Sequence, residues 1–211
     1  MTKIRTRLTQ PSGRLNRSME AGSALSCVTD EELVAAVQSG DMKSLGQLVV
    51  RWERPLLRFV SRMVPRPEDA RDVCQETFLR ILNRADRFRS GSRFSTWMYQ
   101  IALNLCRDQA RSRRRWGKIV DDGREAPTET TAAAGPSPEA GTEANELSRA
   151  VRSGLQEIPA EQREVLILKE YEGLKFKEIA EVLSCPESTV KSRMYYGLNG
   201  LRNALAKQGI R

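Results

Sequence analysis

The sequence predicts an all-α protein: two small helical domains joined by a flexible acidic linker, the C-terminal domain containing a helix-turn-helix. Two observations predict this class. Apolar residues recur at helical spacing, as at Phe176, Ile179 and Leu183, where they would line one face of a helix. A proline- and alanine-rich acidic stretch without aromatic residues, 117–148, separates the two helical parts. Such a stretch buries too little apolar surface to offset the entropy of ordering it.

Charge and composition divide the chain of 211 residues, net charge +8, into four segments. Residues 1–28 are basic and are expected to form a disordered arm, and residues 29–116 are basic and helical. The acidic linker 117–148 follows, and residues 149–211 form the second, basic domain. The basic arm has no apolar segment after it, so a signal peptide is not expected. No stretch approaches the roughly 20 apolar residues of a membrane helix, so direct membrane insertion is not expected.

Composition also limits the chemistry. The chain contains no histidine, which excludes His-dependent acid–base catalysis, Ser-His triads and Cys/His zinc sites. We therefore expect no catalytic residues, no metal and no cofactor. Four cysteines occur without a CxxC pair, at Cys27, Cys74, Cys106 and Cys185. This spacing favours reduced, mostly buried thiols over a redox switch.

The N-terminal domain begins at a capping box, in which Thr29 and Glu32 stand three residues apart before an apolar helical pattern. That helix is expected to close near Gly40. A second helical pattern follows, and Pro55 is expected to start a third helix that ends before Pro65.

Acidic residues at the start of the next helix suit the positive end of its dipole. Its outer face carries Asp69, Asp72, Gln75 and Glu76 beside Leu79. A polar face with one exposed leucine is either solvated surface or a docking face, and composition favours solvated surface.

Aromatic residues, arginines and small polar residues are interleaved after this helix. The candidate contacts are Arg89, Ser90, Ser92, Arg93, Phe94, Trp97 and Tyr99. Aromatic faces stack on exposed bases and arginine binds phosphates, which is the chemistry of single-stranded nucleic-acid binding. The alternative is a hydrophobic core that takes up Phe94, Trp97 and Tyr99 at least in part. The helix continues to a basic end, where phosphate contacts are expected at Asn104, Arg107, Arg111 and Arg114.

The C-terminal domain is expected to form helices over 147–158, 161–171 and 176–183, followed by a tight turn. Ser184 and Glu187 have capping-box spacing for the next helix. Small polar and basic residues at a helix start fit a DNA major groove; here they are Ser188, Thr189, Lys191, Ser192, Arg193 and Tyr196. A generic helical hairpin is the alternative.

Four stretches together resemble the extracytoplasmic-function (ECF) sigma factors of bacterial RNA polymerase. They are Asp69–Phe78, Phe94–Asn104, Ile158–Val165 and Glu178–Arg193, and the similarity covers about 29–116 and 147–207. The chain departs from the family at Ser188, where relatives often have glycine. It departs again at Tyr196-Gly197-Leu198, where relatives often have two more basic residues.

The resemblance implies a two-domain promoter-recognition subunit. Residues 29–116 would be sigma region 2, whose Asp69, Asp72, Gln75, Glu76 and Leu79 would dock on core polymerase. Its segment from Phe88 to Asn104 would open the promoter minus-ten element and hold a flipped base, and Arg107–Arg115 would hold phosphates. Residues 149–211 would be region 4, with the helix from Glu187 reading the minus-thirty-five element. The acidic linker would lie near the RNA exit path.

The resemblance also implies a cytoplasmic protein without chemistry of its own. Its partners would be core polymerase, promoter DNA both duplex and melted, and an anti-sigma protein that could hold it at the inner membrane. No small-molecule substrate is expected. The rival functions are a stand-alone helix-turn-helix regulator of duplex DNA, a metal-dependent nuclease and a polymerase-binding protein that does not start transcription. The nuclease needs clustered carboxylates in a basic cleft, which the sequence does not suggest.

Overall fold

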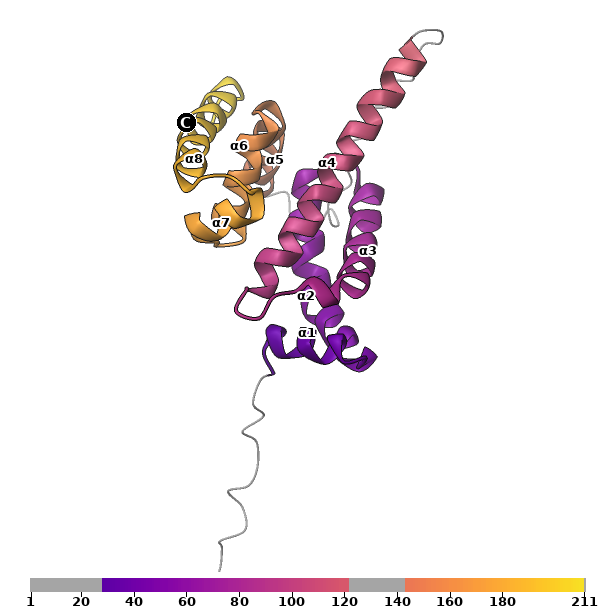
Figure 1. Ribbon diagram of the computed structural model, residues 1–211. Helices are drawn as coiled ribbons and strands as arrows, with labels where there is room; N and C mark the ends of the chain where they lie inside the picture. The colour runs from indigo at the N-terminus through magenta and orange to yellow at the C-terminus, as the bar shows by residue number, and fades with distance from the viewer. Residues whose placement is uncertain (1–27, 122–142, 211) are drawn as a thin grey trace, which may run out of the picture.

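The computed structural model describes residues 28–121 and 143–210, with side chains described over 28–115 and 146–210 (Figure 1). The described chain is helical and contains no strand, which confirms the all-α class. The N-terminal helices are α1 (Asp30–Gln38), α2 (Met42–Met63), α3 (Pro67–Asn83), the 3-10 turn η1 (Ala85–Arg87) and α4 (Phe94–Asp121). The C-terminal helices are α5 (Glu143–Glu157), α6 (Ala160–Leu166), the π-helical turn η2 (Ile167–Tyr171), α7 (Phe176–Leu183) and α8 (Glu187–Lys207).

Both ends of the predicted linker are helical. Helix α4 continues to Asp121 and α5 begins at Glu143, because a helix already formed gains one hydrogen bond for each residue added. The rest of the linker, the basic arm up to residue 27 and Cys27 lie outside the described residues.

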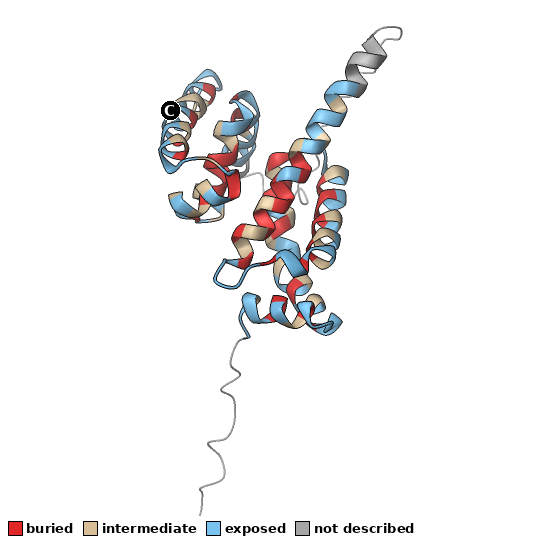
Figure 2. Cartoon of the chain, viewed as in Figure 1, coloured by how far each residue is buried: buried red, intermediate tan, exposed pale blue. Residues whose placement is uncertain are grey.

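Helices α1 to α4 form one bundle, in which α2 packs against α1, α3 and α4. Its core contains Leu48, Phe59, Ile81 and Met98, all 0–1% exposed. In Figure 2, buried residues follow the part of α4 that lies against its neighbours, while the stretch that follows, up to residue 115, is mostly exposed. The predicted capping box is present: the Glu32 N–H donates to Thr29 Oγ1 (3.2 Å) and the Thr29 N–H donates to Glu32 Oε2 (2.8 Å).

The helix start predicted at Pro55 is wrong, because α2 runs through this residue without a break. A proline inside a helix removes one hydrogen bond and costs about 3 kcal/mol. Leu48, Leu56 and Phe59, on both sides of Pro55, are fully buried on one continuous face. Burying each such side chain contributes about 1.5–3 kcal/mol, which outweighs the cost of the proline.

Helix α8 is the centre of the C-terminal domain and packs against α5, α6 and α7. Two glycines that weaken an isolated helix have a packing role here. A Cβ at Gly200 would lie 2.9 Å from Ile158 Cγ2, and one at Gly197 would lie 3.2 Å from Leu166 Cδ1. Glycine at both positions therefore lets α8 approach its neighbours closely.

The helix-turn-helix consists of α7, the turn at residues 184–186 and α8. The capping box predicted at Ser184 is wrong: Ser184 ends α7 in the left-handed conformation, with φ of 52°. Helix α8 begins after Pro186, which makes no side-chain cap. Because Ser184 closes the preceding helix, its hydroxyl is not placed at the start of the next one.

No helix within 28–121 or 143–210 has both the length and the apolar composition needed to cross a bilayer.

Candidate nucleic-acid interface

The loop before α4 and the first turn of that helix are anchored by helix α1. The Phe94 N–H donates to Glu31 Oε1 at 2.8 Å, so a carboxylate satisfies a free backbone donor at the start of α4. Gln38 Nε2 donates to the carbonyls of Ala85 (2.8 Å) and Phe88 (3.1 Å). These contacts place the arginine-rich loop at the edge of the bundle.

The aromatic residues of this segment divide between core and surface. Phe94 is fully buried, with its ring centroid 6.0 Å from that of Trp52 and 6.4 Å from that of Trp97. Tyr99 is also buried, with its ring 4.8 Å from Phe59. The alternative of a partial core therefore describes Phe94 and Tyr99, and the half-buried Trp97 is the ring that reaches a surface cavity.

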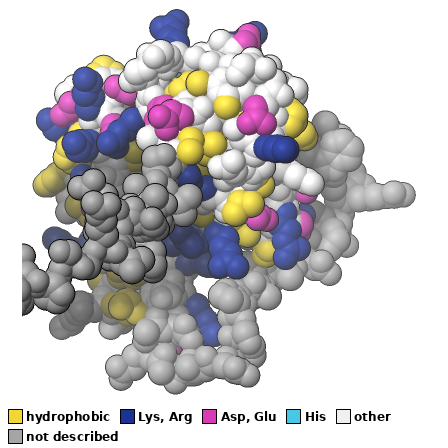
Figure 3. Space-filling model, turned by 90° about the horizontal axis from the view of Figure 1, so that it is seen from below, with side chains coloured by type: hydrophobic (Ala, Val, Ile, Leu, Met, Phe, Trp, Pro, Cys, Tyr) yellow, Lys and Arg dark blue, Asp and Glu magenta, His cyan; other side chains and the backbone are white. Residues whose placement is uncertain are grey.

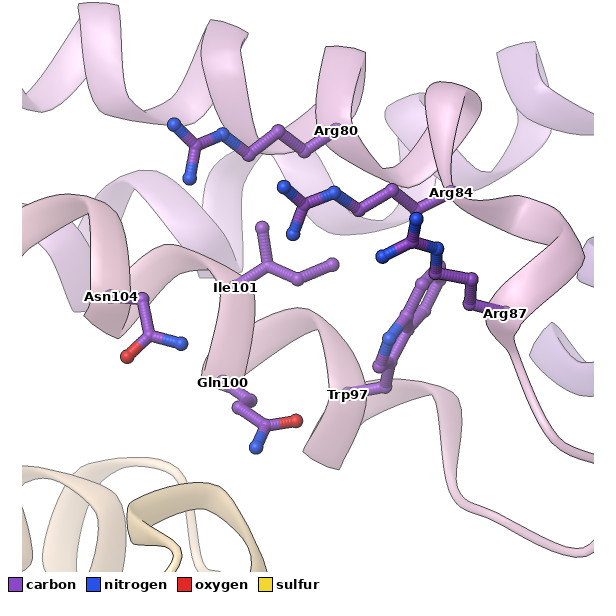
Figure 4. Close-up of a pocket in the computed structure, with 7 residues that line it drawn as sticks. All are labelled: Arg80, Arg84, Arg87, Trp97, Gln100, Ile101 and Asn104. Atoms are coloured by element: carbon purple, nitrogen blue, oxygen red, sulfur yellow. The ribbon is translucent and has the colours of Figure 1, made fainter.

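That cavity, here called the arginine cavity, lies between the end of α3 and the first half of α4 (Figure 4). The guanidinium groups of Arg80, Arg84 and Arg87 line one side. The side contributed by α4 consists of Trp97, Gln100, Ile101 and Asn104. Cations beside an aromatic ring and two amides can bind a phosphate and an adjoining base.

The three arginines of this cavity are not among the DNA contacts predicted from the sequence. Their spacing was a usable signal, since positions 80, 84 and 87 fall on one face of a helical repeat. Arg80 forms an ion pair with Glu76 at 2.9 Å. Arg84 and Arg87 are exposed and have no acidic partner among the described side chains.

A second cavity adjoins the first and shares Arg87, Trp97 and Gln100 with it. It brings together four of the predicted DNA contacts, Arg89, Ser92, Arg93 and Trp97, beside Phe88 and Thr96. Ser90 is exposed in the same loop. One further lining residue, Glu181, comes from α7 of the other domain. Seen from below, basic side chains gather near the centre of the face, with acidic and hydrophobic ones around them (Figure 3).

The basic end of α4 contains both paired and free arginines. Arg111 pairs with Asp108 at 2.6 Å, and Arg113 pairs with Asp69. Arg114 is exposed. Of the predicted phosphate contacts, Arg111 and Arg114 therefore face solvent, and Asn104 faces the arginine cavity.

The predicted docking face lies on the outside of α3. Asp72 and Gln75 are exposed, and Leu79 is 53% exposed. Asp69 differs from them, because it also accepts a 2.8 Å hydrogen bond from Gln109 and is held inside its own domain. Leu79 and the polar residues around it are therefore the part of this face that a partner can reach.

The start of α8 presents the predicted base-reading residues to solvent. Ser188, Lys191 and Ser192 are exposed, and Tyr196 is 60% exposed. Lys191 pairs with Glu187 one turn earlier, at 2.7 Å. Thr189 and Arg193 are half-buried.

Arg193 is held within its own domain, since its Nη2 lies 2.6 Å from Glu161 Oε2. It is therefore less available to DNA than Lys191.

The two domains meet where α4 and α2 face α7 and η2. Arg107 binds Glu164 with both ends of its guanidinium group, Nε to Oε1 at 2.9 Å and Nη2 to Oε2 at 2.6 Å. This hydrogen bonding raises the pKa of Arg107. The Tyr99 hydroxyl donates to Glu172 Oε2 at 2.5 Å. Burial is the main cause that raises the pKa of Tyr99, and this hydrogen bond is the second.

Four more contacts cross the domain boundary. Gln156 Nε2 donates to the Arg62 carbonyl at 3.3 Å, and the Arg62 guanidinium lies 4.0 Å from the centre of the Tyr171 ring. Arg93 Nη1 lies 2.7 Å from Glu178 Oε1, and Gln100 Nε2 donates to Ser184 Oγ at 3.3 Å. Nothing in the sequence pairs these residues, because each contact joins positions more than 80 residues apart in the chain.

The thiols and carboxylates offer no separate chemical site. Burial raises the pKa of Cys74 and of Cys106 to about 12, so neither is a ready thiolate at neutral pH. Among the described residues, no group of three or more Cys, Asp and Glu side chains is placed to hold a metal ion.

Comparison with known proteins finds two family models in this chain. Sigma-70 region 2 matches residues 48–116, and Sigma-70 region 4 matches residues 148–199. The RNA polymerase sigma-H factor of Pseudomonas aeruginosa is 33% identical over 180 residues, covering 83% of this chain and 93% of the relative. The ECF RNA polymerase sigma-E factor of Salmonella typhimurium is 35% identical over 180 residues, covering 83% and 94%.

A solved structure shares the fold. CnrH in complex with the cytosolic domain of CnrY has a TM-score of 0.62 and 26% identity, covering 84% of this chain and 97% of that one.

Proposed function

The chain belongs to the extracytoplasmic-function sigma factors of RNA polymerase, and we propose that its two domains divide promoter recognition between them. The domain of residues 29–116 binds and opens the minus-ten element. The domain of residues 149–211 reads the minus-thirty-five element. The stand-alone helix-turn-helix regulator is not favoured, because the family match includes the N-terminal domain as well.

One observation carries the minus-ten assignment: the two adjoining cavities around Trp97 combine one accessible ring with five arginines. Melted DNA exposes base faces and phosphates together. Trp97 supplies a stacking surface, Gln100 and Asn104 supply amides for base edges, and the arginines supply phosphate contacts. Phe94 and Tyr99 support this surface from within the core.

The minus-thirty-five assignment is supported by the exposed start of α8. Its Ser188, Lys191 and Ser192 are exposed and stand at the start of the helix that a helix-turn-helix inserts in the major groove. Lys191 is the residue best placed for a guanine edge or a phosphate.

Core polymerase would dock on the outer face of α3, centred on Leu79 with Asp72, Gln75 and Glu76 around it. Asp69 would act indirectly by holding Arg113 and Gln109 of α4. An anti-sigma protein is a further proposed partner, since the structurally similar CnrH forms a complex with the cytosolic domain of CnrY. The protein would work in the cytoplasm, without catalysis of its own and possessing no small-molecule substrate.

In vitro transcription tests this proposal, with bacterial core polymerase, a pool of random promoter-like DNA and the full chain. Protein-dependent transcripts that share two spaced upstream motifs are expected. Lys191→Ala should weaken selection of the upstream motif by about 1–3 kcal/mol, and Arg84→Ala with Arg87→Ala should reduce strand opening. Arg202→Ala, on an exposed part of α8, is the control for lost positive charge. Core binding without protein-dependent transcripts would refute the proposal.

A further inference from the structure

We infer that the C-terminal domain of the free chain occludes its own minus-ten surface, using carboxylates where DNA phosphates would bind. This inference rests on the function proposed for the N-terminal domain and adds a means of regulating it. The carboxylates are Glu164 on α6, Glu172 after η2 and Glu178 on α7. Glu164 and Glu178 each pair with an arginine of the predicted DNA surface, and Glu172 accepts a bond from Tyr99 in the core behind it.

The strongest of these contacts is the pair between Arg107 and Glu164. Both carboxylate oxygens accept a bond from the same guanidinium, at 2.9 and 2.6 Å, which is the bidentate geometry arginine also uses for phosphate. The Glu164 side chain is only 3% exposed. A carboxylate withdrawn from water in this way needs a cationic partner, so Arg107 cannot serve Glu164 and DNA at the same time.

Acidic side chains also contact the edge of the minus-ten surface, where the arginines stay more exposed. Glu178 pairs with Arg93 at 2.7 Å, and Glu181 forms part of the wall of the second cavity beside Arg89 and Trp97. Gln100, which lines both cavities, is bonded to Ser184 in the turn of the helix-turn-helix. Acidic side chains therefore face the basic loop where a nucleic-acid strand would enter.

The occlusion is one-sided. At the start of α8, Ser188, Lys191 and Ser192 are exposed. The closed chain can therefore offer its minus-thirty-five helix to duplex DNA while its minus-ten surface is covered. Separation of the domains, as a sigma factor must undergo to span both promoter elements, releases Arg93 and Arg107 together.

The double variant Glu164→Gln with Glu178→Gln tests the inference in the full-length protein. Glutamine keeps the shape of glutamate but removes the charge that balances each arginine. The matched control is Glu146→Gln with Glu157→Gln, which removes the same charge from the same domain at two exposed positions of α5. Circular dichroism melts check folding, and Glu178→Gln alone serves if the double variant does not fold.

Binding is measured with a fluorescent single-stranded DNA of random sequence and with a random duplex. We expect the test variant to bind the single strand about tenfold more tightly than the control, because a larger fraction of molecules is open. The affinity for the duplex should be equal in the two variants. Equal single-strand affinities would overturn the inference.

Small-angle X-ray scattering separates this inference from the function on which it rests. The test variant should have a larger radius of gyration than the wild type and the control. Equal radii of gyration in the three proteins would show that these carboxylates do not hold the two domains together, and would overturn the inference. Expansion without single-strand binding by any variant would instead refute the minus-ten assignment of the N-terminal domain.

Discussion

Replacing Phe94 by alanine distinguishes a core ring from a base-stacking ring. Phe94 is 0% exposed and its ring centroid lies 6.0–6.5 Å from those of Trp52, Phe88 and Trp97. Truncating a fully buried phenylalanine costs about 3–5 kcal/mol, because apolar contacts are lost and a cavity remains. A domain has about 5–15 kcal/mol of stability in all. We therefore expect Phe94→Ala to lower the free energy of unfolding of the N-terminal domain by a large fraction.

The assay is urea denaturation of the full chain, followed by circular dichroism and by tryptophan fluorescence, since Trp52 and Trp97 adjoin the site. Phe94→Leu is the control, because a large apolar side chain retains most of the packing and should cost about 1.5 kcal/mol or less. A loss below about 1 kcal/mol in Phe94→Ala, combined with loss of single-strand binding, would refute the core assignment. It would show that the ring acts on DNA.

Three further outcomes follow from packing and capping. Gly46→Ala should stabilise α2 by about 0.5–1 kcal/mol, because no atom lies within 4 Å of the new Cβ. Gly200→Ala should instead destabilise by about 1 kcal/mol, since overpacking against Ile158 exceeds the gain in helix propensity; chemical denaturation compares the two, and equal effects would contradict the close approach of α8. Thr29→Ala should lower the melting temperature by a few degrees. Bonds from Thr29, first from its backbone N–H and then from its hydroxyl, lower the pKa of Glu32. The part of the cap that needs ionised Glu32 is therefore present above the ordinary pKa of glutamate and is lost as the pH falls through the lowered pKa. The bond from the Glu32 N–H to the Thr29 hydroxyl does not need that charge, so the difference between variant and wild type should shrink at low pH without vanishing.

Local patterns were sufficient for most of the secondary structure. The capping box at Thr29, the break at Pro65 and the apolar spacing of α7 each depend on residues within one or two helical turns. The failures at Pro55 and Ser184 concern tertiary packing and the competition of two neighbouring helices for one residue. Pro55 stays inside α2 because the helix face around it is buried, and Ser184 ends α7 instead of starting α8.

The sequence indicated which segment carries the candidate site, but it indicated less well which residues of that segment reach the surface. Interleaved arginines and aromatics indicated a nucleic-acid surface, and Trp97 with Arg89, Ser92 and Arg93 does line one cavity. The same pattern could not tell that Phe94 faces the core. Helical spacing says which residues share a face, whereas burial depends on which helix packs against that face.

The sequence by itself determined the helical class and the two-domain organisation, and its motifs identified the family. These follow from composition, periodicity and short motifs, which are properties of neighbouring residues. Only the tertiary structure decided which charges are free. Arg107, Arg113 and Arg114 are similar in sequence, yet Glu164 holds the first, Asp69 holds the second and the third is exposed. Their partners come from distant segments, so the availability of each arginine depends on how the helices pack.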